Sequence, residues 1–421
     1  MKKLSRVLAA VLSVLMIMSC FVGCHKKGEI AYTIGDHTYT SAMYSCVLYI
    51  SASSARGLID TYISDNKIET KKVDYFDYKF NEERKVDPKG TISYSEHVKA
   101  EAVRILTQYS VIMDKMKAEK LEMDKDAVET AKVQASYYWY VGCDYDTYSY
   151  YTSYGADPSS YFTPYATYFE PNGVALSTYE QYMVYEYMYN FYFEHLYDEG
   201  GAKEVAKEDL NKYLSEHYTI ADIISFSKID DEQKQLSDDE LTKLKKQADD
   251  YAKRINDGET FEVIYKDYED SLKTEEEKKE EEKKEEDKKE EDKKEDTSSD
   301  SDKTDDKKEE DKKEEYTPES YTNVFGAEGT DYESALYDDI NKLTVGQAVV
   351  IDDTDSKSYV LAVKGDILKE SYWLDNMRSG ILLDLKQDEY DKDLDEAAKT
   401  LTVTVDKHAI APFGVKDIKF Q

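Results

Sequence analysis

Apolar residues recur at helical spacing along much of this chain. One series follows Ser95 and comprises Ala102, Ile105, Tyr109, Ile112 and Met116, which follow one another at three- to four-residue steps. This spacing predicts an amphipathic helix with one buried face. The same pattern predicts further helices after Asp124 as far as Trp139, and over residues 207–216, 241–256, 261–268, 332–343 and 371–399.

Alternation of apolar and polar residues predicts short β-strands. Residues 30–34 and 37–40 flank Gly35 and Asp36, a turn pair, so a hairpin is expected there. Thr40 or Ser41 can then cap the helix that follows. Further strands are predicted over residues 220–226, 348–351, 358–363 and 402–405.

The region between residues 137 and 197 is rich in tyrosine. Residues 143–173 mix Tyr with Ser, Thr, Asp, Pro and Gly, which predicts an irregular loop. Ser177 and Glu180 form an expected capping box for a helix that ends at Gly200. For this helix we favour core packing of the tyrosines over a ligand-binding surface. For the loop, both interpretations stay open.

A tract of Lys, Glu and Asp interrupts the pattern over residues 273–316. It cannot bury apolar surface, and we interpret it as a spacer. Before the tract, the strand at 220–226 has no partner, and after it a hairpin has one helix to cover it. Joined, the halves form a sheet covered by helices on its apolar faces. We therefore predict that the tract is an insert within one domain and that residues 220–226 pair with 358–363.

Composition limits the classes of function. The 421 residues carry a formal net charge of −34, which argues against a nucleic-acid partner. Cys46 and Cys143 are far apart, and we expect two free, buried thiols. Because no metal-binding spacing of Cys or His occurs, we expect no metal and no cofactor.

The N-terminus has the organisation of an export signal. Basic residues precede an apolar run over residues 7–18, which ends before Cys24 and a polar segment. This resembles a bacterial lipoprotein signal, in which such a Cys is lipidated, although Phe21 stands where Leu is usual. Cys20 is a competing cleavage point, and an ordinary secretory signal is the alternative. We expect a lipid anchor at Cys24 on the extracytoplasmic face of a bacterial cell membrane.

Several segments follow one another in a characteristic order around the tract. They are ADIISFSK (221–228), KRINDGETFEVIYKDYED (253–270), NKLTVGQAVVI (341–351) and KSYVLAVK (357–364). This order resembles a parvulin-type peptidyl-prolyl isomerase domain. The hairpin YTIGDHTYTSAMYS (32–45) and the lead-in VAKEDLNKYLSEHYTIADII (205–224) are similar to those of SurA- and PrsA-like foldases.

The resemblance implies an α+β fold with a helical chaperone region. The expected parts are a signal peptide (1–23), a SurA-like helical domain (24–214), the two halves of a parvulin-like domain (215–272 and 317–368) around the insert (273–316), and a C-terminal helix and strand (369–421) that pack back on the N-terminal domain.

The resemblance also implies where an isomerase site would lie. The reaction is rotation about an X-Pro bond, which is slow because rotation breaks amide resonance. Parvulins use two His and a Cys or Asp, hydrogen-bonded across the sheet. The His positions fall on Asp222 and Val360, and the third falls on Asp270. We therefore predict a degenerate site with weak or no isomerase activity, in which Asp222 and Asp270 are the candidate catalytic residues. The candidate client-binding residues are Ile224, Phe226, Phe325 and Tyr359.

The sequence supports one function above another. The first is a membrane-anchored foldase or chaperone that binds unfolded, newly exported polypeptides. The alternative is a surface lipoprotein that binds glycan or peptide through the tyrosine-rich region.

Overall fold

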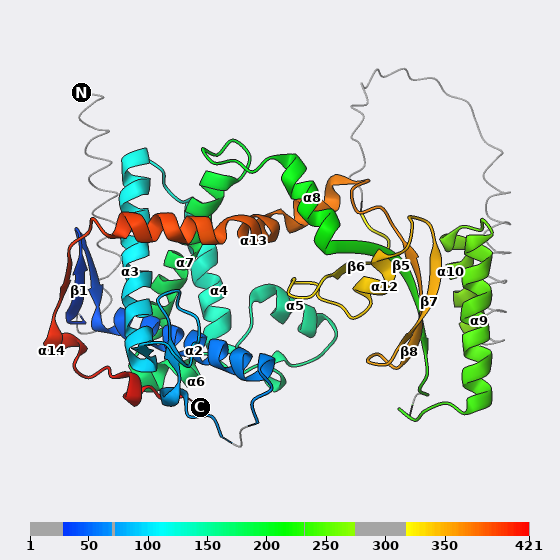
Figure 1. The fold of residues 1–421 in the computed structure, drawn as a ribbon, viewed down its shortest axis with the longest axis horizontal. Helices are drawn as coiled ribbons and strands as arrows, with labels where there is room; N and C mark the ends of the chain where they lie inside the picture. Colours follow the sequence, from blue (N-terminus) through cyan, green and yellow to red (C-terminus); the bar gives the residue numbers. More distant parts are fainter. Residues whose placement is uncertain (1–27, 70–71, 231, 274–316, 421) are drawn as a thin grey trace, which may run out of the picture. The chain divides into compact units, whose positions relative to one another are not determined.

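The computed structural model describes residues 28–69, 72–230, 232–273 and 317–420, and the chain divides into two units (Figure 1). Unit 1 comprises Met1–Glu204 and Lys386–Gln421, and unit 2 comprises Val205–Leu385. Each unit combines helices with small antiparallel sheets, so the predicted α+β class is confirmed. Cys24 and residues 274–316 lie outside the described residues, so the lipidation site and the insert stay predictions.

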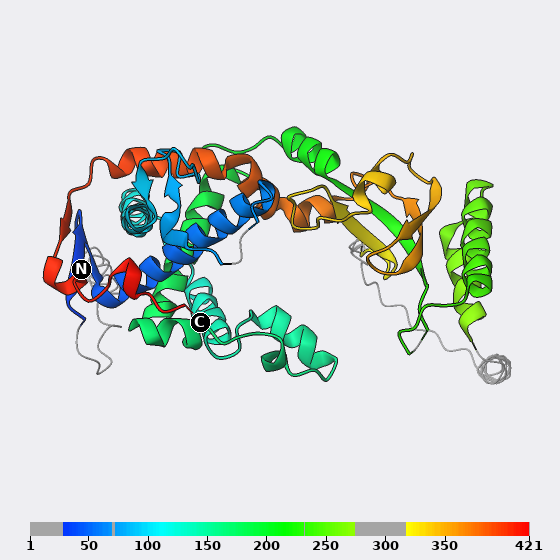
Figure 2. The ribbon, with the colours of Figure 1, turned by 60° about the horizontal axis from the view of Figure 1, so that its bottom comes forward.

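A three-stranded sheet joins the two ends of the chain in unit 1. Strands β1 (Ile30–Ile34) and β2 (His37–Thr40) form the predicted hairpin, with Gly35 at a φ of 57° in the turn. Strand β9 (Val403–Val405) pairs with β1 from the other side. Figure 2 shows the red C-terminal segment beside the dark blue hairpin. The C-terminal strand therefore pairs with the N-terminal hairpin.

Side-chain caps define the starts of the main helices of unit 1. Thr40 caps α2 (Ser41–Asp65), and Ser93 and Glu96 form a complete capping box for α3 (Tyr94–Glu119). Asp124 caps α4 (Lys125–Tyr140), as predicted. Strands β3 (Lys79–Phe80) and β4 (Ile92–Ser93) form a minimal ladder before α3. Among the helices of the described residues, none has the length and apolar character needed to cross a bilayer.

Tyrosines form much of the core of unit 1. Helix α7 (Leu176–Tyr197) buries Tyr192 and Tyr197 against Tyr390, which belongs to α13 (Ser371–Ala398). The hydroxyl of Tyr192 donates to Glu119 at 2.8 Å, so burial of the ring leaves its polar atom satisfied. Core packing is thus confirmed for this helix. The free thiols of Cys46 and Cys143 are also buried, as expected.

Two predictions for the tyrosine-rich region are wrong. Residues 143–173 form α5 (Tyr145–Ser153), α6 (Ala166–Phe169) and two short 3-10 turns instead of an irregular loop. The reason is that Asp144 and Asp157 act as helix caps, accepting from the backbone N–H groups of Thr147 and Ser159. Helix α7 begins one residue before Ser177 and has no side-chain cap, so the expected capping box does not form.

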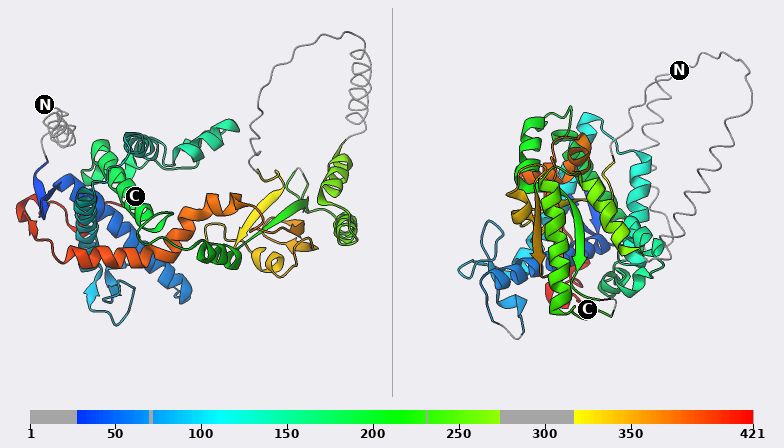
Figure 3. Two further views of the ribbon diagram at one scale, coloured as in Figure 1. Left: turned by 90° about the horizontal axis from the view of Figure 1, so that it is seen from above. Right: turned by 90° about the vertical axis from the view of Figure 1, so that its right-hand side faces the viewer.

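The sheet of unit 2 has the strand order β6-β5-β8-β7, and all its pairs are antiparallel. Strand β5 (Tyr218–Ser227) precedes the insert, whereas β6 (Thr322–Gly326), β7 (Ala348–Asp353) and β8 (Ser358–Lys364) follow it. Figure 3 shows β5 in green beside β6 in yellow. Ile224 lies opposite Leu361, so the predicted pairing across the insert is confirmed.

Helices cover the two faces of this sheet. Helices α9 (Asp238–Asn256) and α10 (Phe261–Leu272) pack on the face that carries Ile224, Phe226 and Leu361. Helix α12 (Tyr337–Asn341) covers the other face, which carries Phe325 and Val360. Helix α8 (Lys207–His217) leads directly into β5. The helix predicted over residues 332–343 is therefore shorter than expected, and β6 was not predicted.

Candidate functional site

The first candidate site surrounds Asp222 in the middle of β5. Side chains alternate between the faces of a strand, so Asp222 shares a face with Ile224 and Phe226, beneath α9 and α10. Its carboxylate accepts a hydrogen bond from the hydroxyl of Thr322 at 2.6 Å. Thr322 lies directly opposite Asp222 in β6, so the sheet register produces this contact.

The surroundings of Asp222 are acidic and aromatic. Burial raises the pKa of Asp222, the Thr322 hydrogen bond opposes this shift, and Glu262 and Glu319 add to it. Burial, with the same carboxylates nearby, also raises the pKa of Tyr321 to about 12. The ring of Tyr321 packs against Phe261 and Tyr265 of α10, with centroids 4.9 and 4.8 Å apart.

The second candidate catalytic residue, Asp270, lies elsewhere on α10. It forms an ion pair with Lys273 at 3.0 Å, one helical turn later, and its side chain is about half exposed. Glu262, in the first turn of α10, is the carboxylate of this helix that raises the pKa of Asp222. Asp270 follows Glu262 by eight residues, or about 12 Å of helical rise. The structure therefore does not bring Asp222 and Asp270 together.

The strand register places Val360, the second of the two His positions, away from Asp222. The resemblance implies a polar position at Val360, but Val360 lies opposite Ser225 and packs in the core of the other face. The residue opposite Asp222 in β8 is Val363, and Leu361 is the next one on that face. Both are apolar, so the polar group that the resemblance requires in β8 is missing at the structurally matched position as well.

The four candidate client-binding residues occupy different places. Ile224 and Phe226 are each 2% exposed beneath α9 and α10, and Phe325 is 7% exposed in the core on the opposite face. Tyr359 is partly buried, and the ammonium of Lys228 lies 5.0 Å from its ring centroid. Of these four side chains, only that of Tyr359 has substantial solvent-exposed surface. Their role in binding stays a prediction.

The groups around Asp222 provide little hydrogen-bonding stabilisation for a twisted prolyl amide. An ionised Asp222 is only an acceptor, and the Thr322 hydroxyl already donates to it. The nearby His217 is engaged at the end of α8, where its ring stacks on Tyr213 and its Nδ1 meets the backbone oxygen of Tyr213 at 3.0 Å. In the described part of the chain, no group of three His, Cys, Asp or Glu is placed to hold a metal ion.

A groove in unit 1 is the second candidate site. Its volume is about 980 Å³, within the range of ligand-binding clefts. It lies between α3 and the C-terminal segment, which includes β9 and α14 (Lys407–Ile410). Tyr32 and Val405, which are paired in the sheet, both line it. The other apolar side chains that line it are those of Tyr44, Ala100, Val103, Ala398, Ile410, Ala411 and Phe413.

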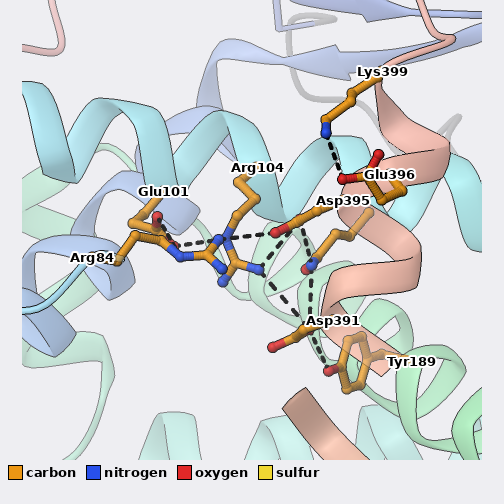
Figure 4. Close-up of polar contacts among 9 residues, drawn as sticks. Arg84, Glu101, Arg104, Tyr189, Asp391, Asp395, Glu396 and Lys399 are labelled. Carbon is orange, nitrogen blue, oxygen red and sulfur yellow. Dashed lines mark hydrogen bonds and ion pairs between the residues drawn. The ribbon is translucent and has the colours of Figure 1, made fainter. Parts of the chain in front are cut away.

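A network of ion pairs fixes one wall of this groove (Figure 4). Asp395 of α13 accepts a hydrogen bond from Arg84 at 3.0 Å and lies 3.6 Å from Arg104 of α3. Asp391, one turn earlier, accepts a hydrogen bond from the hydroxyl of Tyr189 at 2.8 Å. Gln108 donates to both carboxylates, at 3.2 and 3.0 Å. The C-terminal part of α13 is therefore tied to α3 and α7.

The groove was not predicted from the sequence. Its lining comes from β1, α2, α3, the end of α13 and the last residues of the chain, which are far apart in the sequence. Thr322 and Glu262 near Asp222 were also missed, because the pairing of β6 with β5 brings in Thr322 and the packing of α10 on the sheet brings in Glu262. The alternation of apolar and polar residues after residue 402 is the signal that could have indicated the C-terminal wall.

Comparisons with known proteins give a limited result. No family model matches this chain, and no curated protein matches it. Among solved structures, the chain is similar to PrsA from Bacillus subtilis, with 13% sequence identity and a TM-score of 0.25. The match covers 74% of this chain and 87% of that one. A likeness of this extent supports no conclusion about the fold, the function or the chemistry of either site.

Proposed function

We propose that this protein is a membrane-anchored, extracytoplasmic chaperone that holds newly exported polypeptides. The observation that carries the proposal is the groove of unit 1, whose lining is mostly apolar and which is open to the side chains of an unfolded chain. Non-directional apolar contact suits a chaperone, because it accepts many sequences. In this proposal the parvulin-like sheet of unit 2 has weak or no isomerase activity, for the reasons given by the surroundings of Asp222.

The position of the groove fits an anchor at Cys24. Five residues separate Cys24 from Ile30, the first residue of β1, and an extended chain spans at most about 20 Å over these six steps. A lipidated Cys24 would therefore keep the β1 end of unit 1 close to the membrane surface. An exported chain would meet the groove soon after it leaves the membrane.

The groove can be tested by adding a charge to its apolar lining. Ala100 lines the groove, and its side chain is exposed, so Ala100→Glu leaves the core of α3 intact. We expect the full chain to suppress aggregation of a reduced model client, and we expect this variant to need about tenfold more protein for the same effect, because a client must then desolvate a carboxylate. The measurement is light scattering of the client against chaperone concentration.

A matched control is available on the same helix. Ala118 of α3 is also exposed but does not line the groove, so Ala118→Glu adds the same charge elsewhere. This variant should behave as the unmodified chain does. Equal loss in both variants would point to net charge instead of the groove, and no suppression by the unmodified chain at severalfold excess would overturn the chaperone proposal.

A second function has one observation in its favour. Five tyrosines between residues 140 and 161 are exposed, and stacked rings are a usual surface for sugars as well as peptides. Under this alternative the protein is a surface lipoprotein that binds glycan through the tyrosine-rich region. An array of bacterial glycans with the full chain tests it: binding to a defined glycan without any effect on client aggregation would favour the alternative.

A further inference from the structure

The surface of the tyrosine-rich region combines exposed rings with carboxylates. We call residues 140–161 the aromatic arm. Its exposed tyrosines are 47–76% accessible, which is unusual for a side chain that can bury so much apolar area. They are Tyr140, Tyr145, Tyr150, Tyr154 and Tyr161.

Four rings of the arm, those of Tyr150, Tyr151, Tyr154 and Tyr161, form a continuous series of contacts. Tyr150 lies 5.1 Å from Tyr154 and 5.7 Å from Tyr151, measured between ring centroids. Tyr151 lies 5.1 Å from Tyr161. Contact between neighbours limits the freedom of each ring, so a ligand that binds them orders few side chains on arrival. The series is longer than a single small ligand requires and suits an extended chain.

The charge of this region has one sign. No Lys or Arg occurs between Lys132 and Lys203, whereas Asp144, Asp146 and Asp157 lie within the arm. Asp146 and Asp157 are exposed. A negative surface of this kind attracts cationic ligands and repels anionic ones, including acidic glycans and phosphates.

The ring faces of the arm are also free of internal cations. Elsewhere in the described part of the chain, cations stack on rings, as Arg56 does on Tyr75 at 4.5 Å and Lys203 on Tyr197 at 5.4 Å. No contact of this type involves a ring of the arm among the described residues. Electron-rich ring faces next to carboxylates are the environment in which an Arg or Lys side chain is bound most readily.

We infer that the aromatic arm binds Arg- and Lys-rich segments of extended polypeptide through cation–π and charge contacts. This inference deepens the proposed chaperone function, because it names the class of client segment that unit 1 recognises outside the groove. The guanidinium group of Arg is favoured over the ammonium of Lys, since its planar face stacks on a ring.

The test uses the full chain and a labelled twelve-residue peptide of Arg, Gly and Ser. A second peptide has citrulline at each Arg position, which keeps the shape and removes the charge. Binding is measured by fluorescence anisotropy. We expect the Arg peptide to bind at least about tenfold more tightly than the citrulline peptide. Equal binding of the two peptides would overturn the inference.

Variants separate the rings from the charge. Replacing Tyr150, Tyr154 and Tyr161 by Ser should weaken binding of the Arg peptide by about tenfold, whereas replacing them by Phe should leave it within about twofold. The control is Tyr332→Ser in unit 2, because Tyr332 is 47% exposed and outside the arm. It should not change binding. If the triple Ser variant does not fold, Tyr154→Ser alone, at the most exposed ring, should weaken binding by about threefold.

The outcomes distinguish this inference from the chaperone proposal. Unchanged binding in the folded triple Ser variant, or in Tyr154→Ser, would show that charge alone attracts the peptide, and displacement of the peptide by a neutral oligosaccharide would show a glycan site. Either result overturns the inference, even where the groove still suppresses aggregation. Conversely, ring-dependent binding of the Arg peptide supports it even if the full chain fails in the aggregation assay.

Discussion

Glu186 of α7 is a partly buried carboxylate of unit 1. The hydroxyl of Tyr109 donates a hydrogen bond to it, and Tyr182 is a second hydrogen-bonding partner. Burial raises the pKa of Glu186 above its ordinary value of 4.5, although both hydrogen bonds oppose the shift. A raised pKa in the folded state means that this group favours folding at low pH, and that this contribution is lost as the pH rises from about 4.5 through the raised value.

Glu186→Gln removes this dependence and keeps an acceptor for Tyr109. We expect the variant to gain stability relative to the unmodified chain as the pH rises from 4 to 7, because Gln has no charge to desolvate. The measurement is the thermal unfolding midpoint of both proteins across this range. Glu170→Gln is the control, since Glu170 is exposed. A difference in midpoint that is constant with pH would contradict the account of Glu186.

The surroundings of Asp222 lead us to expect weak or no isomerase activity from unit 2. A twisted prolyl amide needs a hydrogen-bond donor or a complementary dipole, and the β8 residues beside Asp222 are Leu361 and Val363. In a proline-peptide isomerisation assay we expect the full chain to accelerate the reaction by little or nothing. Asp222→Asn and Asp270→Ala should each change the rate by less than about twofold. A rate typical of parvulins that falls tenfold in either variant would show a working site.

At the scale of elements, α13 is attached to α3 by partly buried ion pairs. Asp395 has a side-chain exposure of 27% and meets both Arg84 and Arg104. Asp395→Ala leaves two guanidinium groups without this partner, so we expect the free energy of unfolding to fall by about 1–3 kcal/mol, less than for a fully buried pair. Urea denaturation followed by circular dichroism gives this value.

Asp393 provides the matched comparison on the same helix. It forms an ion pair with Lys203, but its side chain is 51% exposed. Asp393→Ala should therefore cost at most about 1 kcal/mol. Similar losses at Asp393 and Asp395 would mean that the network of Figure 4 has no special part in fixing the wall of the groove.

Elements whose signal lies within their own residues were predicted from the sequence, and elements that depend on distant partners were not. The start of α4 was predicted because apolar periodicity and the capping side chain of Asp124 mark the same place, and apolar periodicity alone placed the start of α3 within one residue. Strand β6 was missed, because its five residues gain their structure from pairing with β5 rather than from their own pattern. The helical turns of the aromatic arm were missed because Asp and Ser serve equally well in loops and as caps.

The candidate sites were harder to predict than the fold, because both depend on contacts between distant segments. Asp222 was identified, but its partner Thr322 lies on the far side of the insert. Val360 lies on the opposite face of the sheet from Asp222, and the sequence could not show this, because a shift of one residue in register exchanges the faces of a strand. The groove of unit 1 requires β1 and β9 to pair before its lining residues come together.

At the scale of the whole molecule, one sheet is built from segments on both sides of the charged insert. Strand β5 precedes residues 274–316, and its partners β6 and β8 follow them. The core of this sheet is formed by residues from both sides, such as Phe226 and Leu361. If the insert is a spacer, unit 2 should fold without it, because the packing of its described core needs no residue from that tract.

Replacing residues 274–316 by a flexible linker of twelve Gly and Ser residues tests this directly. Each halving of a flexible loop lowers the entropy cost of closing it by about 0.6 kcal/mol, so the free energy of unfolding should stay the same or rise by about 1 kcal/mol. Client aggregation and Arg-peptide binding should not change, since the groove and the aromatic arm belong to unit 1. A control linker that keeps the original length separates loop length from composition. Loss of cooperative unfolding with both linkers would mean that the charged tract takes part in the fold, and that unit 2 is more than a sheet closed around a spacer.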